Sequence, residues 1–393
     1  EPYRRQRQMC IRDSDIIFSQ KYLELDKLNV NLWKFWKQKT QFMGLLEAIG
    51  NLHIINVVLC ALIGVVFTLW FIPQILVVSF KKKLFDFADE RKVHTGVVPR
   101  LGGVAFVPSI LVSVSLMAGI SSLVLPGDAN VFVVPTLQMA FGLCSLILLY
   151  FEGIMDDLVG LRYRVKFVIQ ILCALLIVAS GIWLNDFHGL FGLAGLSPWF
   201  GVPFSVLLVV FIINAINLID GIDGLASGLS IVSAFFFGIM FCYEGYWGFA
   251  MLAFSLMGTL VPFFYYNVFG DAQKRRKIFM GDTGSQCVGL ILSVLAIRLS
   301  MTLPDEQPKI SGIIIVAFSM LLVPAFDVVR VMVHRFRRHK NVFEADNSHI
   351  HHKLLMLGMT HKVAMITILV ISMFFVMMLS LIHISEPTRQ EAI

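Results

Sequence analysis

Long apolar runs separated by short polar loops occupy most of this 393-residue chain. A transmembrane helix needs about 20 apolar residues, and about ten runs meet or approach that length. Hydrophobic residues make up 57% of the chain and charged residues 15%, which excludes an ordinary soluble domain. We therefore predict an all-α fold, a polytopic membrane bundle of about ten transmembrane helices. The runs lie near residues 54–80, 103–125, 131–151, 167–184, 203–218, 226–243, 246–266, 285–303, 311–333 and 363–383.

The two ends of the chain do not share this pattern. Residues 1–50 are predicted to be a leader, and residues 1–14 within it resemble translated adaptor sequence. The lysines and tryptophans of residues 15–50 would also suit an amphipathic helix at the membrane surface. Residues 384–393 are interpreted as a second non-native segment, which leaves residues 51–383 as the transmembrane domain.

Basic residues gather in alternate loops. The loop after the second predicted span, residues 125–130, has no Lys or Arg, whereas the loops after the third, seventh and ninth spans each carry several. The positive-inside rule places these basic loops in the cytoplasm. They account for the net charge of +6, so we expect no nucleic-acid partner. The loop after the first span is also basic, with Lys81, Lys82, Lys83, Arg91, Lys92 and Arg100.

The polar motifs all lie on this predicted cytoplasmic side. Asp156-Asp157 follows the third span, Asn217-Leu-Ile-Asp-Gly-Ile-Asp-Gly224 follows the fifth, and Gly281-Asp-Thr-Gly-Ser285 opens the eighth. His349-Ile-His-His352 follows the ninth. Because all of them fall on one predicted side, we expect the helices to form one bundle with a polar face at a single membrane surface.

Carboxylates are prominent in two of these motifs. The adjacent Asp156 and Asp157 suit a hard divalent cation such as Mg²⁺, and helix capping is the alternative. Asp220 and Asp223 lie three residues apart beside glycines that permit close backbone approach to a ligand. The alternative for them is a helix break with two solvated acids. Burying carboxylates in so apolar a chain is costly unless a cation compensates, which favours a metal site.

The other two motifs suit phosphate groups. Gly281–Ser285 starts a helix, whose first backbone amides bind anions, and an ordinary N-cap is the alternative. Asp282 would repel a bare phosphate, so we expect a metal ion between the two. His349, His351 and His352 suit donation to phosphate oxygens or acid–base chemistry, with a zinc site and a solvated loop as alternatives.

Together these features indicate a metal-binding, phosphate-handling site at the lipid boundary, which suits phosphoryl transfer from a soluble nucleotide to a lipid head group. At these motifs the chain resembles the polyprenyl-phosphate N-acetylhexosamine-1-phosphate transferases, glycosyltransferase family 4. The resemblance extends from about residue 80 to 360 and includes Asp89-Glu-Arg-Lys-Val-His-Thr-Gly96, Pro99-Arg-Leu-Gly-Gly103 and Phe279-Met-Gly-Asp-Thr-Gly-Ser285. The first of the matching motifs, Asp89–Gly96, and the last, His349-Ile-His-His352, are similar to the branch that uses UDP-N-acetylglucosamine.

The resemblance implies roles for individual residues. Asp282 and Asn217 would hold the cofactor Mg²⁺, with Mn²⁺ as an alternative, and Asp156 would orient or deprotonate the lipid phosphate. Lys92, His94 and Arg100 are candidates for phosphate contact. The implied catalytic residues are Asp156, Asp157, Asp220, His349, His351 and His352, and the implied substrate-binding residues are Lys92, His94, Arg100, Gly221, Asp223, Asn267 and Phe279.

The implied reaction transfers N-acetylhexosamine 1-phosphate, most simply GlcNAc 1-phosphate, from a UDP-sugar to undecaprenyl phosphate and releases UMP. It would start cell-envelope glycan synthesis at the cytoplasmic face of a bacterial inner membrane, and a homodimer is compatible with the sequence. The rival hypothesis is an ion-coupled transporter, because intramembrane acids often mark ion paths. A transporter would place its charges near mid-span. A scaffold or receptor would leave the acidic motifs without a purpose.

Overall fold

The computed structural model describes residues 52–84, 97–124, 135–193, 195–302, 312–338 and 349–385. The chain divides into two compact units, and of the first, Glu1–Ile55, the described part is the start of one helix. The second unit, Asn56–Ile393, holds the bundle. Lys92, His94, the predicted leader and most of the predicted tail lie outside the described residues.

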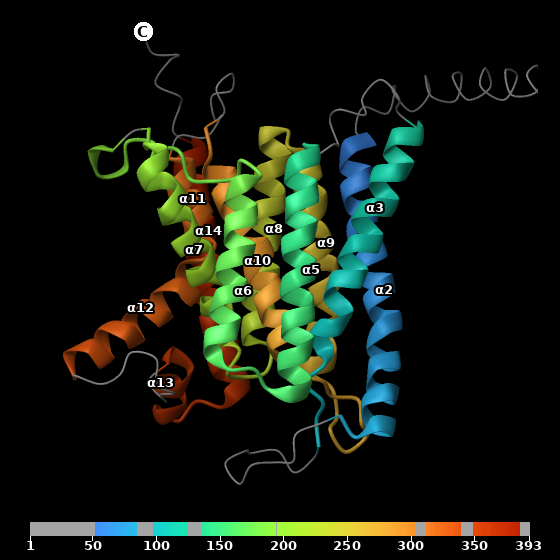
Figure 1. Cartoon of the computed structure of the whole chain (residues 1–393). Helices are drawn as coiled ribbons and strands as arrows, with labels where there is room; N and C mark the ends of the chain where they lie inside the picture. Colours follow the sequence, from blue (N-terminus) through green and yellow to red (C-terminus); the bar gives the residue numbers. More distant parts are fainter. Residues whose placement is uncertain are drawn as a thin grey trace, which may run out of the picture. The chain divides into compact units, whose positions relative to one another are not determined.

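Every regular element in the described ranges is a helix, which confirms the all-α prediction. Eight helices are long and apolar enough to cross a membrane, or nine if one bent pair counts as a single span. Each of the ten predicted runs overlaps a helix within the described ranges, but α6 ends at Ala179, before the predicted end of its run at 184, and with 17 residues it is at the short end for a span. The helices (Figure 1) are α2 (Leu52–Lys82), α3 (Phe106–Val124), α5 (Thr136–Val159), α6 (Tyr163–Ala179), α7 (Pro198–Ile219), α8 (Leu225–Glu244), α9 (Trp247–Val268), α10 (Gly281–Ser300), α11 (Ile313–Ser319), α12 (Leu322–Arg337), α13 (Ile350–Met356) and α14 (His361–Ser385), with short 3₁₀ turns η1 (Gly102–Ala105) and η2 (Leu190–Gly192).

The prediction of one continuous span over residues 311–333 is wrong. Helices α11 and α12 meet there at a bend of 73°, and Figure 1 shows α12 running off to one side. Pro324 supplies the reason, because a proline ring clashes with the carbonyl four residues earlier, here that of Met320 at the break. The charges of Arg335 and Arg337 further disfavour a continued path through lipid.

Helix α10 is the centre of the bundle. It contacts α5, α7 and α8, and its residues from Thr283 to Ser300 are all buried. Small residues allow this close packing, since a Cβ at Gly289 would lie 2.7 Å from the Ile213 Cα of α7. The surrounding helices therefore fix the position of the α10 N-terminus, and with it Asp282.

Candidate active site

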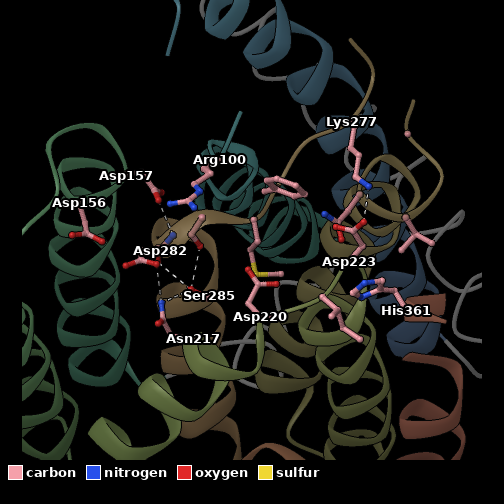
Figure 2. Close-up of a pocket in the computed structure, with 18 of the residues that line it drawn as sticks. Arg100, Asp156, Asp157, Asn217, Asp220, Asp223, Lys277, Asp282, Ser285 and His361 are labelled. Carbon is pink, nitrogen blue, oxygen red and sulfur yellow. Dashed lines mark hydrogen bonds and ion pairs between the residues drawn. The ribbon is translucent and has the colours of Figure 1, made fainter. Parts of the chain in front are cut away.

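A cavity of about 1220 Å³ opens where the ends of α5, α7, α9, α10 and α14 meet. Figure 2 shows Asp156, Asn217 and Asp282 on one side of it, Asp223, Lys277 and His361 on the other, and Asp220 between them. The structure thus brings together carboxylates that lie up to 126 residues apart in sequence. The predicted site residues that line the cavity are Arg100, Asp156, Asp157, Asn217, Asp220, Gly221, Asp223, Asn267, Phe279, Asp282 and His352.

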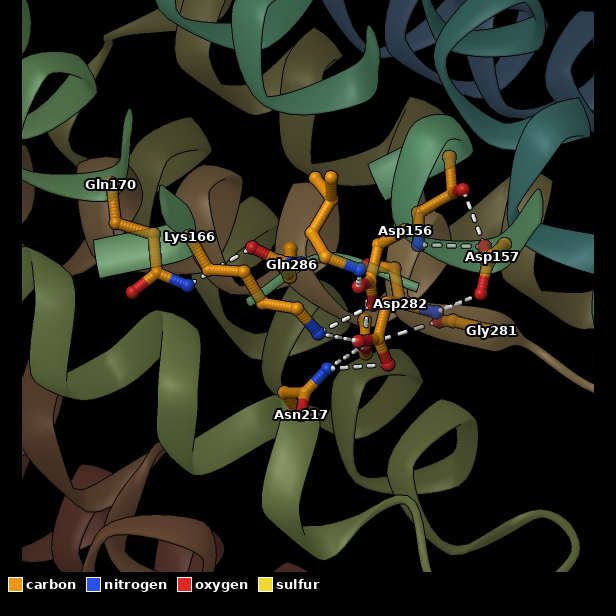
Figure 3. A network of polar contacts seen from close by, with 11 residues as sticks. Asp156, Asp157, Lys166, Gln170, Asn217, Gly281, Asp282 and Gln286 are labelled. Atoms are coloured by element: carbon orange, nitrogen blue, oxygen red, sulfur yellow. Dashed lines mark hydrogen bonds and ion pairs between the residues drawn. The ribbon is translucent and has the colours of Figure 1, made fainter. Parts of the chain in front are cut away.

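A lysine ammonium joins the two carboxylates on the first side. Lys166, at the start of α6, forms ion pairs with Asp156 and with Asp282, the latter at 2.5 Å (Figure 3). The other oxygen of Asp156 accepts a hydrogen bond from the Leu161 backbone N–H at 2.7 Å. Two acids from α5 and α10 therefore converge on one cationic group.

Asp157 makes different contacts from its neighbour Asp156. Its carboxylate accepts hydrogen bonds from the backbone N–H of Asp282 at 2.8 Å and from that of Thr283 at 3.0 Å. It also accepts one from the Thr283 hydroxyl at 2.5 Å. Asp157 thus caps α10 from a neighbouring helix and satisfies amides that have no partner within the helix. The sequence allowed either metal binding or helix capping for Asp157, and its contacts are those of a helix cap.

Gly281 makes that capping contact sterically feasible. Its φ of +74° lies in the left-handed region that favours glycine. A Cβ there would lie 2.6 Å from an Asp157 carboxylate oxygen and would also meet the Arg100 carbonyl oxygen. The glycine is therefore required by the close approach of α5 and the Arg100 segment to the start of α10.

Asn217 orients the acid at the start of α10. Its amide nitrogen donates to an Asp282 carboxylate oxygen at 3.1 Å and to the Ser285 hydroxyl at 2.9 Å. Because Asn217 belongs to the last turn of α7, this contact ties the α7 C-terminus to the α10 N-terminus. Asp282 is consequently held from two helices at once.

The carboxylates of Asp156 and Asp282 suit Mg²⁺ better than zinc. Among the described residues, no group of three or more His, Cys, Asp or Glu side chains is arranged to hold a metal ion, which disfavours a closed zinc site. Mg²⁺ usually uses one or two carboxylates and completes its shell with water and substrate phosphates. Asp156 and Asp282 already share one cation, the Lys166 ammonium, so their oxygens fit such an ion.

Asp220 lies half-buried at the α7 C-terminus between the two sides of the cavity. Burial, together with the charges of neighbouring carboxylates led by Asp282, raises the pKa of Asp220 to about 7. Its carboxyl group therefore exchanges a proton near neutral pH, as a general acid or base requires.

A second ion pair lines the opposite side. The ammonium of Lys277, which is 8% exposed, lies 2.5 Å from an Asp223 oxygen and 5.9 Å from the ring centre of Phe279. Asn267 holds the same region together, since its side-chain oxygen accepts from the Gly224 N–H at 2.6 Å and its nitrogen donates to the Ile278 carbonyl at 2.9 Å. This side combines a buried cation, an aromatic ring and a rigid loop.

The three histidines do not share one position. The Nδ1–H of His349 donates to one carboxylate oxygen of Asp327 at 2.8 Å, and the other oxygen accepts from the Ile350 N–H at 2.8 Å. His351 is buried, and its ring lies where a Cβ on Gly221 would be, 2.6 Å from Cε1. Only His352 of the three lines the cavity. His349 and His351 are thus placed to position α13.

His351 is a neutral group in this setting. Burial, together with the neighbouring rings of His352 and His349, lowers the pKa of His351 to about 4. Its ring lies 4.2 Å from that of His352, centre to centre. The contact supports His352 by packing rather than by charge.

Four cationic or ionisable residues of the site escaped the sequence reasoning. In the sequence, Lys166 and Lys277 belong to the basic loops that indicate the orientation of the chain in the membrane. In the structure, each forms an ion pair with an aspartate of the site. His361 and Lys362, at the start of α14, also line the cavity, and no motif marked them. The one usable signal for Lys166 was its position as a basic residue at the edge of a span, ten residues after Asp156.

Several known proteins are similar in sequence to this chain. A model of glycosyl transferase family 4 matches residues 139–300. A Bacillus subtilis protein named probable undecaprenyl-phosphate N-acetylglucosaminyl 1-phosphate transferase is 31% identical over 327 residues, which cover 82% of this chain and 84% of that protein. Undecaprenyl-phosphate alpha-N-acetylglucosaminyl 1-phosphate transferases are similar too. The Salmonella typhi protein is 30% identical, covering 77% of each chain. The Escherichia coli K12 protein is 29% identical, covering 74% of each.

Proposed function

Because the chain belongs to glycosyl transferase family 4, we propose that it transfers N-acetylhexosamine 1-phosphate from a UDP-sugar to undecaprenyl phosphate in a bacterial inner membrane. The observation that carries this proposal is the convergence of Asp156 and Asp282 on one cation at the mouth of a membrane helix bundle. There a soluble nucleotide and a lipid head group can meet. The names of the relatives support GlcNAc 1-phosphate as the transferred group.

The two sides of the cavity suit the two substrates. Asp156 and Asp282 would hold Mg²⁺, which when bound neutralises phosphate charge and stabilises the departing UMP. On the opposite side, the Phe279 ring and the Lys277–Asp223 pair would receive the nucleotide. The cavity has a volume of about 1220 Å³, above the roughly 300–1,000 Å³ of ordinary ligand pockets, so it would admit a UDP-sugar together with the phosphate group of the lipid.

In the proposed reaction, one phosphorus–oxygen bond forms and one breaks. An oxygen of the lipid phosphate forms a bond to the β-phosphorus, and the bond from that phosphorus to the bridging oxygen breaks, so UMP leaves. Asp220, with a pKa of about 7, would take the proton of the lipid phosphate, a role that the resemblance implied for Asp156, and Asp156 would instead help to hold the metal ion. Asp157 and Asn217 keep Asp282 in position through the reaction.

The orientation follows from charge. The cavity lies at the ends of the helices that adjoin the basic loops, so we place it at the cytoplasmic face. UDP-sugars would then reach it from the cytosol, and the lipid phosphate would enter sideways from the inner leaflet. Residues 51–383 would form the transferase domain.

The direct test is product formation. Purified full-length protein is incubated with undecaprenyl phosphate, Mg²⁺ and each of several UDP-sugars, and UMP and the lipid product are measured. We expect equal amounts of UMP and lipid diphosphate sugar, highest with UDP-GlcNAc and abolished by a chelator. Absence of UMP with every sugar, combined with ion-driven uptake in vesicles, would instead support a transporter.

A further inference from the structure

A second layer of polar side chains lies one helical turn below the residues that face the cavity. The upper layer is Asp156, Lys166, Asn217 and Asp282. The lower layer stands three or four residues away on the same four helices, α5, α6, α7 and α10, in the direction that leads into the bundle. Its members are Glu152, Gln170, Asn214 and Gln286.

Three members of the lower layer are linked by hydrogen bonds. The Gln170 amide donates to the Gln286 side-chain oxygen at 3.0 Å, and the Asn214 amide donates to Gln170 at 2.7 Å. Figure 3 shows Gln170 and Gln286 beside Lys166. The layer is therefore an ordered network inside an apolar bundle, not a group of solvated side chains.

Glu152 is the exception within this network. It is 4% exposed, and within the described part of the chain neither of its carboxylate oxygens has a hydrogen-bond partner. The amide nitrogen of the neighbouring Gln286, which has no other acceptor there, is the polar group that interacts with Glu152. A neutral amide offsets only part of the charge of a buried carboxylate, which leaves Glu152 in need of a cationic partner.

Lys166 is the cation best placed to be that partner. Among charged groups it acts most strongly on Glu152, which lies one turn below Asp156 on the same helix. The long, flexible lysine stem allows the ammonium to reach either level. At the upper level, Lys166 occupies the position between Asp156 and Asp282 that a divalent ion would take.

We propose that Glu152 is a second counter-ion for Lys166, and that it receives the lysine ammonium when a divalent cation binds between Asp156 and Asp282. The inference rests on the metal site of the proposed function. Glu152 touches neither substrate nor metal in this scheme and is a positioning residue. Without it, the displaced ammonium, which is half-buried at the edge of the cavity, has no second carboxylate to pair with, which weakens the binding.

Mn²⁺ binding to the full chain, measured by electron paramagnetic resonance without substrates, tests this inference. We expect Glu152→Gln to weaken Mn²⁺ binding by about tenfold or more, because the displaced ammonium loses its partner. Glu152→Asp retains the charge and should stay within about threefold of the unaltered protein. Glu244→Gln, a charge removal at the far end of α8, should leave the affinity unchanged.

The decisive comparison repeats the Glu152→Gln substitution in a protein that already carries Lys166→Gln. Since no ammonium then competes for the carboxylates, Mn²⁺ should bind more tightly than to the unaltered protein. In that background Glu152→Gln should cost about threefold or less, which is the direct attraction between Glu152 and the ion. The difference between the two backgrounds measures the Lys166–Glu152 coupling.

Two results would overturn the inference while the metal site stands. One is unchanged affinity in Glu152→Gln, and the other is an equal loss in both backgrounds, which means that Glu152 acts without Lys166. A different result concerns the site itself. If Asp282→Asn binds Mn²⁺ as tightly as the unaltered protein, the proposed metal site is wrong and the inference falls with it.

Discussion

The two ends of α10 both carry polar networks, yet they are built differently. At the Ser300 end, Asn185 exchanges two hydrogen bonds with the backbone of Thr302, at 2.6 and 3.0 Å, and His188 lies 2.9 Å from the Ser300 carbonyl oxygen. These side chains satisfy backbone groups near a helix end that have no partner in the helix. At the Asp282 end, Asp157 likewise binds backbone N–H groups, but Asp282 is held by the side chains of Asn217 and Lys166.

The cations at the two ends differ in the same way. Arg298 lies over the ring of Tyr246, 4.1 Å from its centre, and near Phe249 at 5.2 Å, so aromatic packing holds its charge in place. Lys166 lies between two carboxylates at the edge of a cavity, where, in our proposal, a divalent cation replaces it. We therefore interpret the Ser300 end as structural, because its network ends on the backbone, and the Asp282 end as the candidate functional end, because its network ends on charged side chains.

The largest expected effect comes from removing the charge at the cavity end. Asp282→Asn should reduce UMP release by about a thousandfold or more, since it removes an electrostatic group at the reacting phosphates. Its thermal unfolding midpoint in detergent should stay close to that of the unaltered protein. Activity above about a tenth of the original would mean that the cavity end is only another structural network.

Asp157 tests whether one residue combines both kinds of network. Asp157→Ala removes three hydrogen bonds to the start of α10, so we expect about a hundredfold lower activity together with a lower unfolding midpoint. Both are measured on the same detergent preparation. Lost activity with an unchanged midpoint would assign Asp157 a direct chemical role, as its place beside Asp156 first indicated.

The pH profile sharpens the comparison at Asp220. With a pKa of about 7, this carboxyl is protonated in acid and becomes a base as the pH rises, so activity should increase with pH through that value. One unit below the pKa, about a tenth of the plateau rate is expected. In Asp220→Asn this limb should disappear from the profile. An unchanged limb would assign the titration to another group, such as the substrate.

The helices and the meeting of polar residues at one membrane surface were predictable, because both follow from how apolar and charged residues distribute between lipid and water. The apolar runs gave the helices, and basic loops on one side indicated that Asp156, Asn217 and Asp282 would meet. The partners of these residues were not predictable in the same way. Lys166 and Lys277 look like any loop lysine in the sequence, and only the packing of α6 and the 269–280 loop turns them inward.

The bend between α11 and α12 and the anchoring of His349 show two other reasons for a miss. Pro324 carried a usable signal, but a run of apolar residues around it outweighed that signal in the prediction of one span. His349 depends on Asp327, which lies 22 residues earlier in the chain. A local pattern contains no information about such a distant contact.

The smallest expected effect on activity comes from the other end of α10. Asn185→Ala leaves the Thr302 backbone groups without partners and should cost about 1–3 kcal/mol of stability. Its unfolding midpoint should fall by several degrees, while UMP release per folded molecule stays unchanged. A large loss of activity at an unaltered midpoint would contradict the separation between the two ends.

The central claim is that carboxylates from separate helices meet around one divalent ion. Iron-mediated backbone cleavage tests it directly, because Fe²⁺ bound in place of Mg²⁺ cuts the chain next to the ion when ascorbate and peroxide are added. We predict cuts near Asp156, Asn217 and Asp282 in the same sample, suppressed by excess Mg²⁺ and absent in Asp282→Asn. Cuts near only one of these residues, or cuts that Mg²⁺ does not suppress, would contradict the account.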